Sequence, residues 1–106
     1  MISFIDRLTS IGYIVAMKYE VVIKKKAYQG MRNLPRKALI VLRSLLLDLE
    51  NGPVQPKYMN YSKLEESKYH CHLAYHWVAC WECHEGKMIV EVYYVGSRES
   101  APYARH

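Results

Sequence analysis

The residues between positions 35 and 50 give the clearest hydrophobic pattern of the chain. Pro35 suits the first turn of a helix, and Asn51-Gly52-Pro53 favours a helix end with a left-handed cap and a following proline. We therefore predict a helix from about Pro35 to Glu50. Its wide apolar face, at the spacing of a helix, would be made by Ala38, Leu39, Leu42, Leu45, Leu46 and Leu49.

Weaker patterns predict a second helix and four strands. Residues 18–23 are rich in β-branched side chains and predict a strand, and an apolar stripe in residues 24–33 predicts a short helix. Residues 54–67 are poor in apolar side chains and predict a long connection. Three strands follow, at about residues 69–73, 77–83 and 88–95, with a glycine in the turn between the last two.

The order β-α-α-β-β-β predicts an α+β fold, with two helices packed on one face of a small mixed or antiparallel sheet. The length of 106 residues fits one domain. Residues 1–16 have apolar side chains at roughly helical spacing, but serines, a threonine and a glycine weaken the pattern. Two interpretations remain open: these residues are an N-terminal extension, or translation starts at Met17 and the domain is 17–106.

The distribution of apolar residues and cysteines indicates where the protein works. No run of apolar residues is longer than five, so we expect no membrane span. Three cysteines are an odd number, which favours free thiols in a reducing cytoplasm over a set of disulfides. The first residues also lack the pattern of a secretory signal. We therefore expect a cytoplasmic protein without a membrane partner.

The net charge of +5 is concentrated in the first half of the chain. Eight basic residues and one acidic residue lie between Lys18 and Arg43. Such a basic face attracts phosphate backbones or an acidic protein. A solvated helix face that only keeps the protein dissolved is an equally open interpretation.

His70 and His72 are two positions apart on a predicted strand, so their side chains should lie on the same face, opposite Cys71. Imidazole titrates at about pH 6.5, so neighbouring histidines can act as base and acid. Arg98 would supply a guanidinium for a phosphate whose charge grows in a transition state. Tyr103 would stack on a nucleobase or bond to a phosphate. The alternative is that the two histidines are ordinary surface residues.

The cysteines offer a rival interpretation as zinc ligands, because Cys80-Trp81-Glu82-Cys83 has C-x-x-C spacing. On a strand, however, Cys80 and Cys83 would face opposite sides, and no turn is predicted between them. We therefore expect no metal and no cofactor. Trp77 and Trp81 should share one face of the sheet and belong to the core.

Several fragments together resemble the RelE/ParE superfamily of bacterial toxin–antitoxin toxins. Each is weak alone, but their order and spacing over about four-fifths of the chain are fairly specific. They are residues 18–23, Met31-Arg32-Asn33-Leu34-Pro35 with the leucine helix, Lys63-Leu64, Trp77-Val78-Ala79-Cys80-Trp81-Glu82 and the tail from Tyr94 to Tyr103.

The resemblance implies a compact RelE-like fold and a metal-independent endoribonuclease that enters the ribosomal A site and cuts mRNA. In that chemistry the 2′-hydroxyl attacks the adjacent phosphorus and leaves a 2′,3′-cyclic phosphate and a free 5′-hydroxyl. The family's two basic residues on the second strand map onto His70 and His72, without deciding which is acid or base. Its late arginine maps onto Arg98 and its terminal aromatic residue onto Tyr103.

The resemblance also implies partners: a cognate antitoxin protein, the ribosome and mRNA. Six basic residues would dock ribosomal RNA: Lys24, Lys25, Lys26, Arg32, Arg36 and Lys37. One departure concerns Val78, because many members have an arginine at this place. His76 would be the substitute, reaching in from the turn. Two alternatives stay open: a ParE-like toxin that inhibits DNA gyrase, and a catalytically inactive relative that binds an antitoxin.

Overall fold

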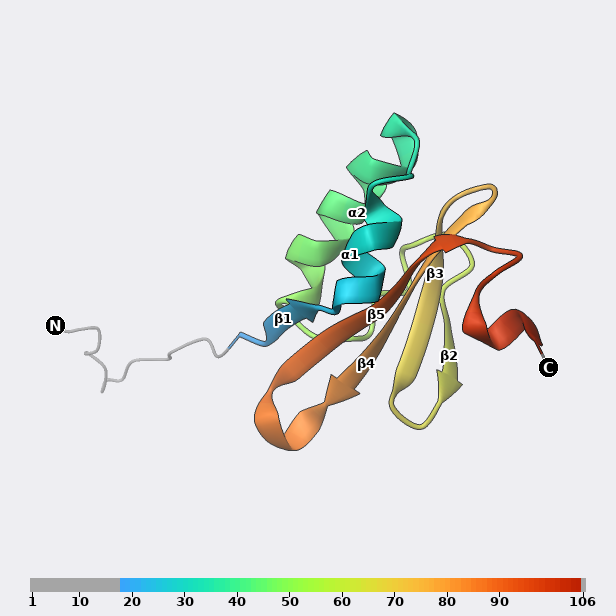
Figure 1. The fold of residues 1–106 in the computed structure, drawn as a ribbon. Helices are drawn as coiled ribbons and strands as arrows, with labels where there is room; N and C mark the ends of the chain where they lie inside the picture. Colours follow the sequence, from blue (N-terminus) through green and yellow to red (C-terminus); the bar gives the residue numbers. More distant parts are fainter. Residues whose placement is uncertain (1–17, 106) are drawn as a thin grey trace, which may run out of the picture.

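Two helices and five strands form two layers in the computed structural model, which describes residues 18–105 (Figure 1). The expectations for residues 1–16 and for a start at Met17 lie outside the described residues. The predicted α+β class is confirmed. The elements are β1 (Glu20–Ile23), α1 (Lys25–Met31), α2 (Arg36–Leu49), β2 (Ser62–Glu65), β3 (Lys68–Ala74), β4 (Trp77–His84), β5 (Ile89–Ser97) and the short 3-10 helices η1 (Glu85–Lys87) and η2 (Pro102–Arg105).

The strands form one mixed sheet in the order β1-β5-β4-β3-β2. β1 pairs with β5 in parallel, and the other neighbours are antiparallel. The prediction of an unbroken connection over residues 54–67 is wrong, because Ser62–Glu65 forms the edge strand β2 on β3. This segment has one apolar side chain, Leu64, so it is held as a strand by backbone pairing with β3 rather than by burial. The observed order is thus β-α-α-β-β-β-β.

Both helices pack on one face of the sheet, as predicted, and the core lies between the layers (Figure 1). The apolar face of α2 is confirmed, since Ala38, Leu42, Leu45 and Leu49 are completely buried. Trp81 from β4 is also completely buried, and its indole N–H donates a hydrogen bond of 3.0 Å to the Pro53 carbonyl. Trp77 packs against the same core, so the two tryptophans share a face as expected.

α1 lies unusually close to β5, and Gly30 makes this possible. A Cβ atom on Gly30 would stand 1.7 Å from the carbonyl oxygen of Val95. Ala27, one turn earlier, is completely buried. The backbone of α1 therefore rests directly on the sheet, with almost no side chain between them. The helix ends at Met31, before the predicted end at residue 33, and a turn leads to α2.

The chain between α2 and β2 is fixed by polar contacts. The Tyr58 hydroxyl donates a hydrogen bond of 2.5 Å to Asp48 Oδ2, and Lys57 Nζ lies 2.9 Å from the same oxygen. Because the tyrosine hydrogen is used there, Ser44 donates to Tyr58 over 2.8 Å. Farther along, the backbone N–H of His72 donates to the Met59 carbonyl. These bonds join the end of α2 to the strand that carries the two histidines.

Candidate active site

His70 and His72 lie on the face of the sheet opposite the helices, as the strand alternation predicted. Between them, Cys71 points into the core beneath the helices. The two imidazole rings have centroids 5.8 Å apart and an edge-to-face arrangement. The pair is therefore set by the regular alternation of β3, a rigid inner strand of the sheet.

The two histidines are buried rather than on the surface. Their exposed fractions are 8% for His70 and 7% for His72. Tyr103, in η2, covers His70 with a ring centroid distance of 4.5 Å. The Tyr103 hydroxyl is buried and has no hydrogen-bond partner among the described residues. The interpretation of the histidines as ordinary surface residues is thus wrong, because the segment after β5 folds back over them.

Burial sets the protonation of the pair. It lowers the pKa of His70, with a smaller contribution from His72, and it lowers the pKa of His72, with a smaller contribution from the positive Arg98. Both rings are therefore neutral at neutral pH and each can accept a proton. Ser62 Oγ lies 3.0 Å from His70 Nδ1 and orients that ring. Sequence reasoning missed Ser62 because it lies on the strand that was predicted as a connection.

Arg98 lies just beyond β5, at the end of the sheet near His72. Its backbone N–H donates a 2.7 Å hydrogen bond to the His76 carbonyl, which ties the β3–β4 turn to the end of β5. The side chain is 42% exposed, and one guanidinium nitrogen is 3.8 Å from the Glu99 carboxylate. The guanidinium also lies over the Tyr75 ring, 5.7 Å from its centroid. Arg98 is thus a partly free cation beside a buried neutral imidazole.

His76 lies outside the buried pair. It is exposed in the turn between β3 and β4, with Nδ1 3.8 Å from the Glu99 carboxylate and its ring centroid 4.5 Å from that of Tyr75. The structure therefore places it with Arg98 and Glu99. Val78 is completely buried and is the register partner of His72 on β4, so no charge enters the site from that position.

The six basic residues expected to dock RNA are exposed, and they belong to the helical layer or the turns beside it (Figure 1). Lys24 precedes α1 and its Nζ lies 4.0 Å from Glu91. The helices cover one face of the sheet and the histidines lie on the other, so the structure does not bring these two groups together. The remaining five are Lys25, Lys26, Arg32, Arg36 and Lys37.

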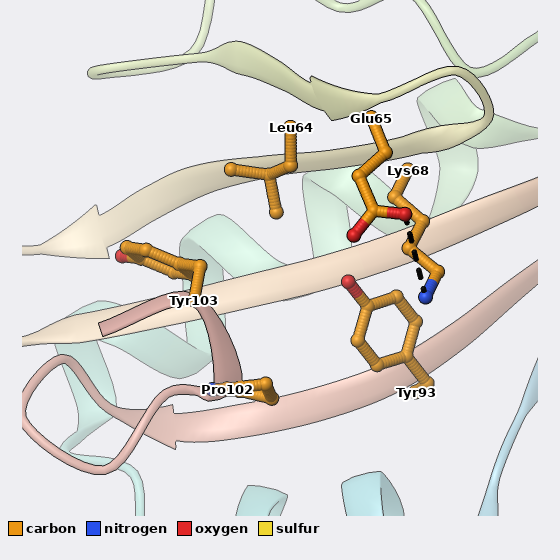
Figure 2. A pocket seen from close by; sticks show the side chains of 6 residues that line it. All are labelled: Leu64, Glu65, Lys68, Tyr93, Pro102 and Tyr103. Atoms are coloured by element: carbon orange, nitrogen blue, oxygen red, sulfur yellow. Dashed lines mark ion pairs between the residues drawn. The ribbon is translucent and has the colours of Figure 1, made fainter. Parts of the chain in front are cut away.

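A pocket of about 410 Å³ opens beside Tyr103 (Figure 2). Its residues come from four separate elements: Leu64, Glu65, Lys68, Tyr93, Pro102 and Tyr103. Lys68 Nζ is 3.9 Å from the Glu65 carboxylate and 5.8 Å from the Tyr93 ring centroid. The pocket combines aromatic walls with a cation and an anion, which suits a flat polar ring next to a charged group. Of this set, sequence reasoning named only Tyr103 as a site residue.

The three cysteines are buried and free. Cys71 and Cys83 belong to the core, whereas Cys80 lies on the histidine side of the sheet, so Cys80 and Cys83 face opposite sides as expected. Burial raises the pKa of both Cys71 and Cys80 to about 12, so they are neutral thiols. Neutral buried thiols are poor nucleophiles, and they give the site no covalent chemistry.

Solved structures with the same fold were found, although no protein-family model and no curated protein sequence matches the chain. The archaeal RelE–RelB complex from Pyrococcus horikoshii aligns with a TM-score of 0.65 at 17% identity, over 80% of this chain and 100% of that one. A mutant of the E. coli RelE toxin in the free state gives 0.63 at 18%, over 83% and 90%. The YoeB dimer from Staphylococcus aureus gives 0.61 at 10%, over 76% and 97%.

The alignments cover nearly all of each of these chains. At such low identity they establish a shared fold, so the compact RelE-like fold expected from the sequence resemblance is confirmed. Among the described residues, no helix is long and apolar enough to cross a membrane. The chain has the fold of the RelE and YoeB toxins.

Proposed function

We propose that this chain is the toxin of a type II toxin–antitoxin pair and that it cleaves mRNA on the ribosome. The observation that carries the proposal is the buried pair His70 and His72, with Tyr103 over one ring and Arg98 beside the other. Two neutral imidazoles side by side are suited to take up and return a proton. The RelE fold supports the same proposal.

The chemistry follows from the protonation of the pair. A neutral imidazole accepts the proton of a ribose 2′-hydroxyl, and the freed oxygen attacks the adjacent phosphorus. The bond from phosphorus to the 5′-oxygen breaks, and that oxygen takes a proton from the other histidine of the pair, which the bound phosphate keeps in its protonated form, leaving a 2′,3′-cyclic phosphate and a 5′-hydroxyl. Arg98 stabilises the negative charge that grows on the phosphate oxygens. The residues needed for these steps are all side chains of this chain.

Tyr103 must move before a phosphate can reach the pair, because the two histidines are less than one-tenth exposed. η2 is four residues long, and Tyr103 is its residue in contact with His70. Once displaced, Tyr103 would offer its ring to a nucleobase. We propose that RNA in the ribosomal A site opens the site in this way, with His76 as a helper at the rim, and that the protein works in the cytoplasm, where its mRNA substrate is translated.

The partner proposed for the toxin is an antitoxin protein. The solved structures that share the fold include the RelE–RelB complex of P. horikoshii and the intact RelBE toxin–antitoxin complex of E. coli. An antitoxin of this chain would fold onto it on binding, over the exposed basic residues of the helical layer. The basic helical layer makes acidic segments the natural complement.

The test is induced expression of the full chain with primer extension on a reporter mRNA. We expect cuts only in translated frames, and their loss in His70→Ala/His72→Ala with the circular dichroism spectrum unchanged. Val54→Ala, an exposed change in the loop before β2, is the matched control and should cut normally. Cutting by the double variant would remove the histidines from the mechanism.

One structural observation favours a chain without nuclease activity, because Val78 brings no charge next to His72. Two outcomes of the experiment would therefore indicate the alternatives. Growth arrest with intact mRNA and altered DNA supercoiling would indicate a ParE-like toxin that inhibits gyrase. No arrest, together with tight binding of an antitoxin, would indicate an inactive relative.

A further inference from the structure

Three side chains with metal-binding atoms meet on the β4–β5 ribbon, away from the two histidines of the active site. They are Glu82, His84 and Glu91, and their ligand atoms all lie within 4.8 Å of one another. Glu82 and Glu91 are direct register partners on neighbouring strands, and His84 is two positions after Glu82. All three therefore lie on one face of a rigid two-stranded ladder.

The distances suit one small divalent ion. His84 Nε2 is 3.3 Å from Glu91 Oε1. Two ligands bound about 2.1 Å from a tetrahedral ion stand about 3.4 Å from each other. This pair is thus at about the separation that an ion requires, and a ligand atom of Glu82 lies within 4.8 Å of both.

The surroundings also favour a cation. Two carboxylates directly opposite each other on one sheet face repel, which destabilises the pair. Each is held through its Oε2 atom by a further group: Ser67 Oγ donates to Glu82 over 3.4 Å, and Lys24 Nζ lies 4.0 Å from Glu91. Such outer contacts orient metal ligands and leave the other carboxylate oxygen turned toward the ion.

We propose that Glu82, His84 and Glu91 form a binding site for Zn²⁺ or a similar divalent transition-metal ion. An imidazole nitrogen beside two carboxylates favours such an ion over Mg²⁺ or Ca²⁺, which prefer oxygen ligands. The side chains of His84 and Glu91 are 41% and 25% exposed. With three protein ligands at the surface, one coordination position stays open to water or an oxyanion. The ion would cross-link β4 and β5 beside η1, and this holds whether or not the chain is a nuclease.

Calorimetric titration of the full chain with ZnCl₂ tests the site, after removal of any affinity tag and of bound metal with EDTA. We expect one ion per chain and a rise of the melting temperature with zinc. His84→Ala and Glu91→Gln should each weaken binding about tenfold or more and abolish the rise. Glu50→Gln is the matched control, since Glu50 is a partly exposed glutamate paired with Lys18 at the end of α2. It should bind zinc like the unmodified chain.

Three results would overturn the proposal. The first is the absence of zinc binding by a chain that is folded by circular dichroism. The second is equal affinity in His84→Ala, which would place the ion elsewhere, for example at the buried histidines. The third is equally tight binding of Mg²⁺, which would contradict the selectivity expected from the imidazole. The melting temperature of each variant without zinc shows whether its fold is intact.

Discussion

His70 and His72 are titratable groups that the fold keeps away from water. Burial lowers the pKa of each below the ordinary 6.5. Below that pH the unfolded chain therefore binds protons at these two positions more readily than the folded chain does. The contribution of these two groups to the free energy of unfolding is therefore complete above about pH 6.5. It is lost as the pH falls from there through the folded pKa values. The site that would bind RNA is also a source of acid sensitivity.

We expect this acid sensitivity to be smaller in His70→Gln/His72→Gln. Melting temperatures of both proteins, measured by circular dichroism between about pH 7.5 and about pH 5, provide the comparison. The unmodified chain should lose more stability on acidification than the variant, because glutamine does not titrate. Parallel curves would show that other groups cause the acid sensitivity.

For single residues, the sequence predicted on which face of the sheet a side chain lies, but not whether that side chain is buried. The alternation of a strand was enough to place His70 and His72 on one side and Cys71 on the other. Nothing in the pattern of the tail indicated that Tyr103 would return to cover His70, because a short segment with a proline has no periodicity to interpret. Ser62 was missed for a similar reason, since its role depends on a strand four residues long.

Among the elements, α1 has the tightest contact with the sheet. Gly30→Ala would place a methyl group 1.7 Å from the Val95 carbonyl oxygen, where neither backbone can easily give way. We expect this change to lower the free energy of unfolding by about 3 kcal/mol, measured by urea denaturation. Gln29→Ala, at an exposed neighbouring position of the same helix, should stay within about 0.5 kcal/mol. Equal stability of the two variants would contradict the close packing.

Elements with long patterns were predictable and short ones were not. α2 was found from its leucines because fourteen residues repeat the period several times. β2 was missed because Leu64 is its one apolar side chain, and because this four-residue edge strand is held in place by backbone pairing with β3. The close approach of Gly30 to Val95 was not predictable either, because a glycine in a short helix has no local sequence feature that indicates such a contact.

The whole molecule separates the six basic residues expected to dock RNA from its two buried histidines. Those six belong to the helical layer or the turns beside it, and the buried pair lies on β3, on the other face of the sheet. An RNA particle as large as the ribosome can contact both faces of the molecule at once, which fits the proposed substrate.

We expect Lys25→Glu/Lys26→Glu to weaken ribosome binding and to reduce its dependence on salt, because fewer counterions are released. Lys63→Glu/Lys87→Glu makes the same change of charge at exposed positions outside α1 and α2 and is the control. Cosedimentation with ribosomes at several salt concentrations provides the measurement. Equal weakening by both pairs would mean that only the net charge matters.

The order of strands was beyond sequence reasoning, and it has a consequence for how the protein is made. β5 is the last strand of the chain, yet it lies between β1 and β4. While the chain is being synthesised, β1 has no neighbour and α1 has no surface beneath Gly30 until β5 has emerged. A chain interrupted before β5 therefore lacks the strand that joins β1 to the rest of the sheet. The two-layered domain, and with it the cover over the histidines, exists only in finished molecules.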